Sequence, residues 1–270
     1  MQQRCIDLNC DLGESDDPAQ IAVDAALLRL VSSVSIACGG HAGDEVSMRR
    51  TVSAAMECGV RVGAHPSFPD RANFGRTDMR MTAGELRECV GVQIRTLARI
   101  AGEEGMRLSH VKPHGALYHA AMTRREVAQA VADAVREVDC TLLLVGQEAA
   151  PGLEWWRAAG ADIAAEAFAD RRYESDGTLR ARQRDGALIT DPAIAADQAL
   201  ALATGMHMAV IGGRSVALRP RTICVHSDTP GAVQVAGAVR RRLEESGIRI
   251  RPMAEEGQAA GGHTGTKKGG

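Results

Sequence analysis

The chain has 270 residues, of which 45% are hydrophobic, and its formal net charge is −2. This length suits one large domain with a sizeable core, such as an α/β barrel of about 250 residues. The small net charge and the 3% of aromatic residues argue against binding to nucleic acid or to an anionic membrane.

The cysteines indicate a reducing compartment. There are seven of them, an odd number, and no two form a Cys-x-x-Cys pair. The first residues contain no apolar signal segment, and no apolar run approaches the ~18 residues of a membrane span. We therefore expect a soluble, cytoplasmic protein.

Short apolar segments alternate with helical patterns along the chain. In chain order, strands are expected at residues 4–8, 34–38, 60–64, 109–111, 141–145, 162–165 and 222–225, with a short one at 248–251. The expected helices cover residues 17 to about 31, the residues after Asp44 up to 59, 82 to about 102, 123 to about 138, 191 to 205 and 229 to 247. One more helix, which contains Trp155, is expected between the strands at 141–145 and 162–165. This alternation predicts parallel βαβ units.

Several of the expected helices begin with capping residues. Thr82 with Glu85, and Thr123 with Glu126, match the capping box. An N-capping residue precedes a proline at positions 17–18, 191–192 and 229–230.

Two segments between these elements are polar and irregular. Residues 66–79 are rich in turn formers but contain two phenylalanines, so we expect an ordered, functional loop. Residues 174–189 are expected to form a lid or flap. The chain is then one (β/α) barrel domain over residues 1–252, followed by a flexible Gly-rich tail over residues 253–270.

Each cluster of ionisable side chains falls just after an expected strand. In a barrel this places all of them on the carboxyl-terminal face, whereas a doubly wound sheet would gather them at one switch point. Because six loops contribute polar groups, the pattern favours a TIM-like barrel. The residues concerned are Asp11, His41, Asp44, His65, Lys112, His114, Glu166, Asp170, Arg171, Tyr173, His226 and Asp228.

One carboxylate and four histidines of this set are candidates for acid–base catalysis, namely Asp11, His41, His65, His114 and His226. The same side-chain types bind divalent metals. No pair has the His-x-x-x-His spacing of many metal sites, so the pattern favours acid–base chemistry. If a metal is bound, its candidate ligands are Asp11, His41 and His65.

Lys112 is the only lysine outside the Gly-rich tail, in a chain that otherwise carries its positive charge on arginine. Lysine and arginine differ in shape and in how readily burial lowers the pKa, so this position is expected to need an ammonium group. Lys112 and Arg171 are candidates to bind a carboxylate or phosphate of the substrate. Asp44, Asp170 and Tyr173 are assigned to substrate binding beside them.

Other polar residues allow two interpretations. Glu166, Asp170 and Asp228 are either acid–base partners or members of an ion-pair network at the barrel rim that orients the cations. His110 and His207 lie in or near strand-like runs and are expected in the core or on the surface.

The sequence lacks the common nucleotide-binding and serine-nucleophile motifs. It contains no Gly-x-x-x-x-Gly-Lys-Ser/Thr, no Gly-x-Gly-x-x-Gly at a helix start and no Gly-x-Ser-x-Gly. Any nucleotide would therefore be bound by an unfamiliar surface or by a partner.

Several sequence blocks resemble the LamB/YcsF family, which is also known as the family of the 5-oxoprolinase A subunit. The blocks cover residues 6–14, 35–44, 62–70, 74–76, 111–118, 166–173 and 225–231, and the resemblance extends from about residue 4 to 252. It implies a TIM-like barrel of seven strands related to the glycoside hydrolase/deacetylase superfamily. Ser227 departs from the family pattern His-Gly-Asp-Thr-Pro-Gly, and a positive φ at this position would strain a serine.

The resemblance also implies a hydrolase that acts on a cyclic amide. The implied reaction is ATP-dependent ring opening of 5-oxo-L-proline (pyroglutamate) to L-glutamate, in a complex with subunits B and C. ATP is then a co-substrate of the complex, and we expect the partner subunits to handle it. Lys112 or Arg171 would hold the anionic groups of the activated ring.

The acid–base roles follow from the same resemblance. Asp11, His41 or His65 would activate water, and His114 or His226 would protonate the leaving nitrogen. Two alternatives remain: a metal-dependent deacetylase or polysaccharide hydrolase, and a non-catalytic subunit that only positions its partners.

Overall fold

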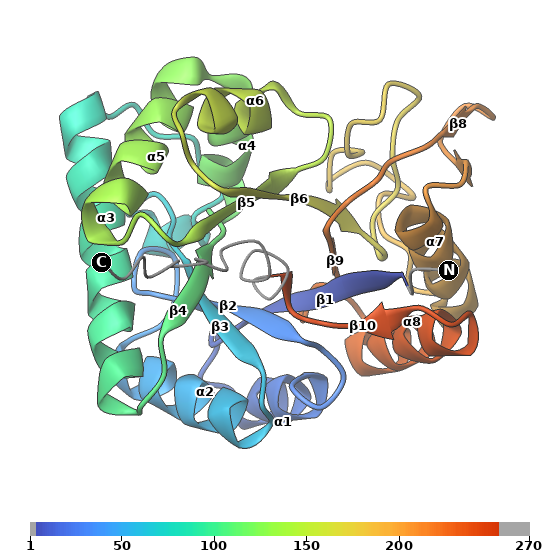
Figure 1. The fold of residues 1–270 in the computed structure, drawn as a ribbon, viewed down its shortest axis with the longest axis horizontal. Helices are drawn as coiled ribbons and strands as arrows, with labels where there is room; N and C mark the ends of the chain where they lie inside the picture. The colour runs from blue at the N-terminus through green and yellow to red at the C-terminus, as the bar shows by residue number, and fades with distance from the viewer. Residues whose placement is uncertain (1–3, 254–270) are drawn as a thin grey trace, which may run out of the picture.

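Seven parallel strands close into a barrel at the centre of the molecule (Figure 1). The structure is a computed structural model and describes residues 4–253. In order around the barrel, the strands are β1 (Cys5–Leu12), β2 (Ser33–Ala37), β3 (Arg61–His65), β4 (Leu108–Val111), β5 (Leu143–Gln147), β6 (Ile163–Phe168) and β9 (Thr222–Cys224). Pairing of β9 with β1 closes the barrel, and β10 (Arg249–Ile250) pairs with the start of β1. The predicted seven-stranded TIM-like barrel is confirmed.

The first strand makes the inside of the barrel polar. Successive residues of a strand point to opposite faces, and β1 alternates apolar and polar residues. Its apolar residues Ile6, Leu8, Cys10 and Leu12 belong to the hydrophobic core. On the other face, the Asn9 amide donates hydrogen bonds to Glu166 on β6 and Thr222 on β9, at 3.1 and 2.6 Å. Polar contacts inside the barrel therefore link β1 to its neighbour β9 and to β6, the next strand around.

The helices form a ring around the strands (Figure 1). They are α1 (Pro18–Leu27), α2 (Glu45–Glu57), α3 (Ala83–Glu103), α4 (Gly115–Thr123), α5 (Arg125–Val138), α6 (Pro151–Ala158), α7 (Pro192–Thr204) and α8 (Ala232–Glu245). Helix α3 packs against α5, and α7 packs against α8. On α5, Val127, Val131 and Val135 recur at four-residue steps and are buried, which is the apolar stripe of a helix packed on one side.

Most predicted helix starts are confirmed, but two predicted caps are wrong. Asp17, Thr82 and Asp191 are N-caps whose side chains accept backbone hydrogen bonds. Thr123 instead ends α4, where its hydroxyl donates to the His119 carbonyl, and α5 begins without a side-chain cap. The Thr229 hydroxyl donates to Asp170, and α8 begins after Gly231.

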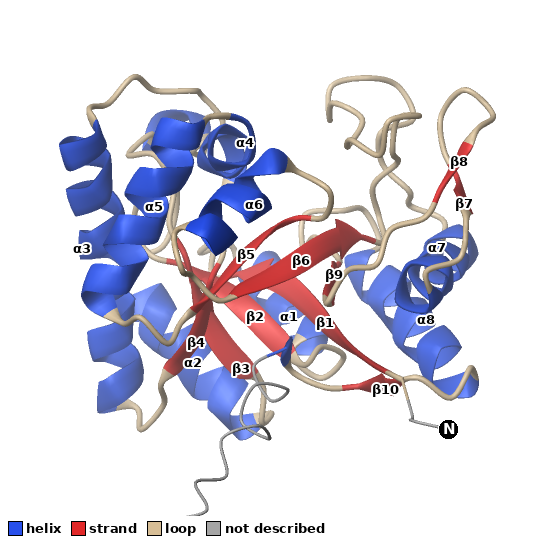
Figure 2. Cartoon of the chain, turned by 45° about the horizontal axis from the view of Figure 1, so that its top comes forward, coloured by secondary structure: helices blue, strands red, loops and turns tan. Residues whose placement is uncertain are grey.

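Two further elements were not predicted. Helix α4 follows β4 directly, and a two-stranded hairpin joins β7 (Met208–Ala209) and β8 (Ser215–Val216). The segment over 174–189 is irregular as predicted, with isolated bridges from Arg171 to Leu188 and from Tyr173 to Leu179 (Figure 2). The loop over 66–79 contains a short 3-10 helix, η1 (Arg71–Asn73).

The remaining predictions concern the membrane and the tail. Among residues 4–253, no helix has the length and apolar character needed to cross a membrane. The predicted tail over 253–270 lies outside the described residues, apart from Met253, which packs against Leu143, Val145 and Ala164.

Candidate active site

A cavity of about 650 Å³ lies at the carboxyl-terminal end of the barrel. Its ionisable lining residues are Asp11, Glu14, His65, Arg76, Lys112, His114, Tyr118, His119, Glu166, Arg171, Arg180, Arg182, His226 and Asp228. They come from strand ends and the loops that follow them, because the carboxyl ends of parallel strands meet at one face. Part of the 174–189 segment also lines the cavity.

Lys112 lies at the centre of a buried charge cluster. The ammonium is 2.8 Å from Asp11 Oδ1, 2.9 Å from Glu166 Oε1 and 3.0 Å from Asn9 Oδ1. Its three N–H groups donate to Glu166, to Asn9 and to the Cys224 sulfur at 3.5 Å, and the Asp11 contact is an ion pair. Although burial opposes its charge, Asp11 and the neighbouring anionic groups raise the pKa of Lys112 well above its usual value. Lys112 is therefore a charged, fully engaged group, which does not fit its expected role in binding a substrate anion.

Glu166 is fully buried and hydrogen-bonded at both oxygens. Oε1 accepts from Lys112 and from the Asn9 amide, and Oε2 accepts from the Tyr118 hydroxyl at 3.0 Å. Burial and the nearby Glu166 carboxylate raise the pKa of Tyr118 well above its usual value, so Tyr118 is a neutral donor. These contacts fix the position of the Glu166 carboxyl group at one wall of the cavity.

His65 and His114 have tautomers that are fixed by the backbone. His65 Nδ1 lies 2.7 Å from the Lys112 carbonyl oxygen, and His114 Nε2 lies 3.0 Å from the Phe74 carbonyl oxygen. A carbonyl oxygen only accepts, so these two nitrogens carry protons. Burial lowers the pKa of His65 well below its usual value and, with His41 nearby, lowers that of His114 to about 4. Both rings are therefore neutral at pH 7.

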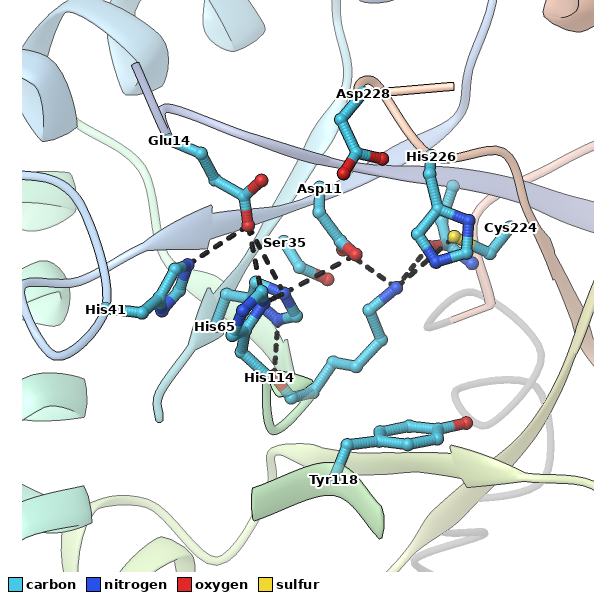
Figure 3. Close-up of polar contacts among 12 residues, drawn as sticks. Asp11, Glu14, Ser35, His41, His65, His114, Tyr118, Cys224, His226 and Asp228 are labelled. Atoms are coloured by element: carbon cyan, nitrogen blue, oxygen red, sulfur yellow. Dashed lines mark hydrogen bonds and ion pairs between the residues drawn. The ribbon is translucent and has the colours of Figure 1, made fainter. Parts of the chain in front are cut away.

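Glu14 lies among three imidazole rings (Figure 3). Its Oε1 atom is 3.0 Å from His41 Nε2, 3.4 Å from His114 Nδ1 and 3.8 Å from His65 Nε2. Burial raises the pKa of Glu14 to about 7, partly offset by His114. His41 stacks on His114 with ring centroids 3.6 Å apart, and burial lowers the pKa of His41 to about 3. His41 is thus a neutral ring that donates to Glu14.

His226 and Asp170 form a second acid–base pair. The His226 ring nitrogen Nδ1 lies 3.0 Å from Asp170 Oδ1, and the His226 backbone N–H and the Thr229 hydroxyl also donate to Asp170. Burial disfavours the imidazolium, but the Asp170 carboxylate outweighs it and raises the pKa of His226. Asp170 is fully used in holding His226, and Nε2 of that ring is left for a ligand in the cavity.

Arg171 is a buried cation with a free donor. Its side chain donates to the Arg180 carbonyl at 2.7 Å, while its buried Nε has no hydrogen-bond partner. Within residues 4–253, no carboxylate forms an ion pair with it. Burial lowers the pKa of Arg171, but the ordinary pKa of a guanidinium is so far above 7 that the side chain stays charged. It is suited to bind an anion that enters the cavity.

Asp228 lies at the cavity mouth between two arginines. It pairs with Arg76 at 3.0 Å and with Arg182, which belongs to the 174–189 segment. Burial opposes ionisation, but the Arg182 contacts dominate and lower the pKa of Asp228. Asp228 therefore joins two loops at the rim, as in the ion-pair interpretation of this residue.

Four candidates lie outside the cavity lining: Asp170, described above, and Asp44, Tyr173 and His41. Asp44 is exposed and is the N-cap of α2, where it accepts from the Ser47 backbone N–H at 2.8 Å. The buried Tyr173 hydroxyl accepts from the Phe168 N–H at 2.7 Å and so anchors its own loop. These contacts give Asp44 and Tyr173 structural roles, and neither residue lines the cavity in which a substrate is expected. His41 does not line the cavity but contacts two residues that do, Glu14 and His114.

Sequence reasoning missed three residues of the site. Asn9 lies within β1, two positions before Asp11, and period two puts both on the same face. Glu14 ends the sequence block that carries the first part of the family resemblance. Tyr118 is on the unpredicted helix α4, four residues after His114. Ser227 does not adopt a positive φ, so the strain expected there does not arise.

Two groups of described side chains could hold a divalent cation. Glu14, His41, His65 and His114 form one group, and Asp11, Cys224 and His226 the other, with ligand atoms within 4.8 Å of one another in each. The Lys112 ammonium lies 2.8 Å from Asp11 and 3.5 Å from the Cys224 sulfur, so a positive charge already occupies the second group.

Comparison with known proteins agrees with this architecture. The sequence model of the LamB/YcsF family matches residues 6–258. The A subunit of 5-oxoprolinase from Chloroflexus aggregans is 49% identical over 246 residues, which cover 91% of this chain and 98% of that protein. A lactam utilization protein of known structure from Thermus thermophilus is 41% identical and has a TM-score of 0.86, with 92% and 99% of the two chains covered. A putative cellobiose-phosphate cleavage protein from Enterococcus faecalis shares the fold at 12% identity, with a TM-score of 0.55 and 93% and 98% covered. The chain therefore belongs to the LamB/YcsF family.

Proposed function

We propose that this chain is the A subunit of an ATP-dependent 5-oxoprolinase, a cytoplasmic hydrolase that opens 5-oxo-L-proline to L-glutamate with partner subunits B and C. The names of its relatives support the assignment to this enzyme. The observation that carries the proposal is Arg171, a buried guanidinium without a carboxylate partner among residues 4–253, in a cavity of about 650 Å³ that also holds acid–base groups. The substrate supplies the matching carboxylate.

The chemistry explains the need for ATP and partners. A lactam carbonyl is a poor electrophile, and transfer of the ATP γ-phosphoryl group to its oxygen would activate it. Water then adds to the carbonyl carbon, and the C–N bond breaks as the nitrogen takes a proton. This leaves an acyl phosphate, from which a second water releases phosphate and glutamate. The chain has no phosphate-binding loop motif, so we assign ATP binding to the partner subunits.

The residues of this chain would bind the substrate and transfer its protons. Arg171 binds the substrate carboxylate with charge-assisted hydrogen bonds. His65 and Glu14 take the proton of the attacking water. His226, held by Asp170 and with a raised pKa, protonates the leaving nitrogen.

The test is glutamate release from 5-oxo-L-proline and ATP, by the chain alone and by the chain mixed with the candidate B and C subunits. Activity in the mixture only is the expected result. Arg171→Gln should raise KM for 5-oxoproline about 10- to 100-fold, since a hydrogen bond to a charged group contributes about 1.5–3 kcal/mol. Arg87→Gln removes one arginine of the α3 surface, which pairs with Glu137 far from the cavity lining, and serves as the control.

Each other outcome has a distinct meaning. No glutamate in either sample would overturn the proposed function. An unchanged KM in an active Arg171→Gln complex would overturn the assignment of Arg171. Hydrolysis of acetylated substrates by the isolated chain without ATP would favour the deacetylase alternative.

A further inference from the structure

We propose that Glu14, His65 and His114 form a binding site for a divalent transition-metal ion such as Zn²⁺ in the wall of the cavity. This set differs from the Asp11, His41 and His65 set expected from the sequence. The inference depends on the geometry of the three side chains and stands independently of the substrate proposed above.

The first argument is the fixed tautomers of the two histidines. Because His65 Nδ1 and His114 Nε2 donate to backbone carbonyls, the ring nitrogens that remain for a ligand are His65 Nε2 and His114 Nδ1. These two nitrogens lie only 3.0 Å apart. Two lone pairs at this distance repel each other unless a cation is shared between them. A positive charge between His65 Nε2 and His114 Nδ1 would therefore stabilise this arrangement.

The second argument is the position of the Glu14 carboxylate. Its Oε1 atom is 3.4 Å from His114 Nδ1 and 3.8 Å from His65 Nε2, so three potential ligand atoms form a triangle with edges of 3.0, 3.4 and 3.8 Å. A point in the plane of this triangle is about 2.0 Å from all three atoms, which matches Zn–N and Zn–O distances. Two histidines and one glutamate are also a ligand set of catalytic zinc sites.

The third argument is the support around the triangle. Metal-bound histidines commonly donate their other ring N–H to a backbone carbonyl, as both rings do here. His41 Nε2 lies 3.0 Å from Glu14 Oε1 and so orients the carboxylate, while the His41 ring stacks on His114. Gly75 leaves room for this stack, because a Cβ there would lie 2.8 Å from His41 Cβ.

The three proposed ligands are accessible from the cavity. Glu14, His65 and His114 all line the cavity, whereas His41 does not. Catalytic zinc sites combine three protein ligands with one position for water or substrate. A bound ion would supply Lewis-acid polarisation of an oxygen in the cavity, and it would then activate the attacking water in place of unliganded His65 and Glu14.

The experiment measures metal and needs neither substrate nor ATP. The full chain is stripped with a chelator and titrated with Zn²⁺ by calorimetry, and with Co²⁺ by visible absorption. We expect one ion per chain, and Co²⁺ bands typical of nitrogen and oxygen ligands. Glu14→Gln, which keeps the side-chain volume, and His114→Ala should each weaken Zn²⁺ binding at least about 10- to 100-fold. Circular dichroism checks that both variants fold.

Two control variants distinguish this site from metal binding elsewhere on the chain. His207→Ala removes an exposed histidine and should leave Zn²⁺ binding unchanged. Cys224→Ser removes the thiol of the second group and should also leave it unchanged. Absence of stoichiometric binding by the unaltered chain would mean that only a proton is shared between the rings. That result, binding retained by both site variants, or binding lost only in Cys224→Ser would each overturn the proposal.

Discussion

Replacing Lys112 with methionine tests whether the buried charge cluster holds the barrel together. The substitution removes the ammonium that lies within 3.0 Å of Asp11, Glu166 and Asn9, and it leaves two carboxylates buried without their cation. Breaking a buried ion pair from one side costs about 3–5 kcal/mol, because the remaining charge has lost its water and its partner. At about 2–4 °C per kcal/mol for a domain of this size, we expect the melting temperature to fall by about 6–20 °C.

The assay is urea unfolding of the full chain, followed by circular dichroism. Lys112→Met combined with Glu166→Gln removes one unpaired carboxylate and should recover about 1–3 kcal/mol relative to Lys112→Met alone. Arg99→Met serves as a control, since Arg99 pairs with Glu45 and Glu103 on the exposed surface and should have little effect. A loss below about 1 kcal/mol in Lys112→Met would refute the reasoning.

The same variant should also change how stability depends on pH. In the unaltered chain, His65 and Lys112 overcome burial and hold the pKa of Asp11 below its usual range. Ionised Asp11 therefore stabilises the folded chain at pH values above its unfolded pKa, and this stabilisation is lost as the pH falls through its folded pKa. Without Lys112, burial would meet less opposition and the folded pKa of Asp11 would rise, so the variant would gain stability as the pH falls. The gap between the two proteins should narrow from pH 7 to about pH 5.

Two further expectations concern His226 and Gly75. Asp170→Asn should lower the pKa of His226, since the Asp170 carboxylate raises it. The alkaline limb of the pH profile of kcat/KM, measured on the reconstituted complex, should then move to lower pH. A limb that does not move would exclude His226 as the proton donor. Gly75→Ala should destabilise the chain more than Gly59→Ala in urea unfolding. Both glycines have a positive φ, 64° at Gly75 and 68° at Gly59, so both substitutions strain the backbone. Of the two, only an alanine Cβ at position 75 would meet other atoms, including His114 Cδ2 at 3.0 Å. Equal losses would mean that the histidine stack tolerates the added methyl group.

The barrel could be predicted because its strands read as short runs rich in apolar residues that alternate with helical patterns. Each run ends in polar and glycine residues, which marks its carboxyl end. Helix α4 escaped detection because its N-cap, His114, makes no side-chain capping bond and Gly115 begins the helix with a positive φ of 54°. The Thr123 cap was misassigned for a related reason: its hydroxyl bonds within the preceding helix.

The site could be predicted in outline but not in its internal pairing. Strand ends correctly indicated which side chains meet, yet the position after a strand is also the start of a helix. At Asp44 the capping role applies, since aspartate is a favoured N-cap. Lys112 was recognised as unusual, but its carboxylate partners come from β1 and β6, and pairings between distant strands are not encoded in local spacing.

The polar lumen also determines when the site can come into existence during folding. Asp11 lies in β1 and Lys112 directly follows β4, whereas Glu166 and the strand that closes the ring on β1 come later in the chain. A half-barrel would expose an apolar outer layer and an inner face of charges that still lack part of their set. Barrel closure and charge matching are therefore one cooperative event, and this chain is poorly suited to being divided into independently folding halves.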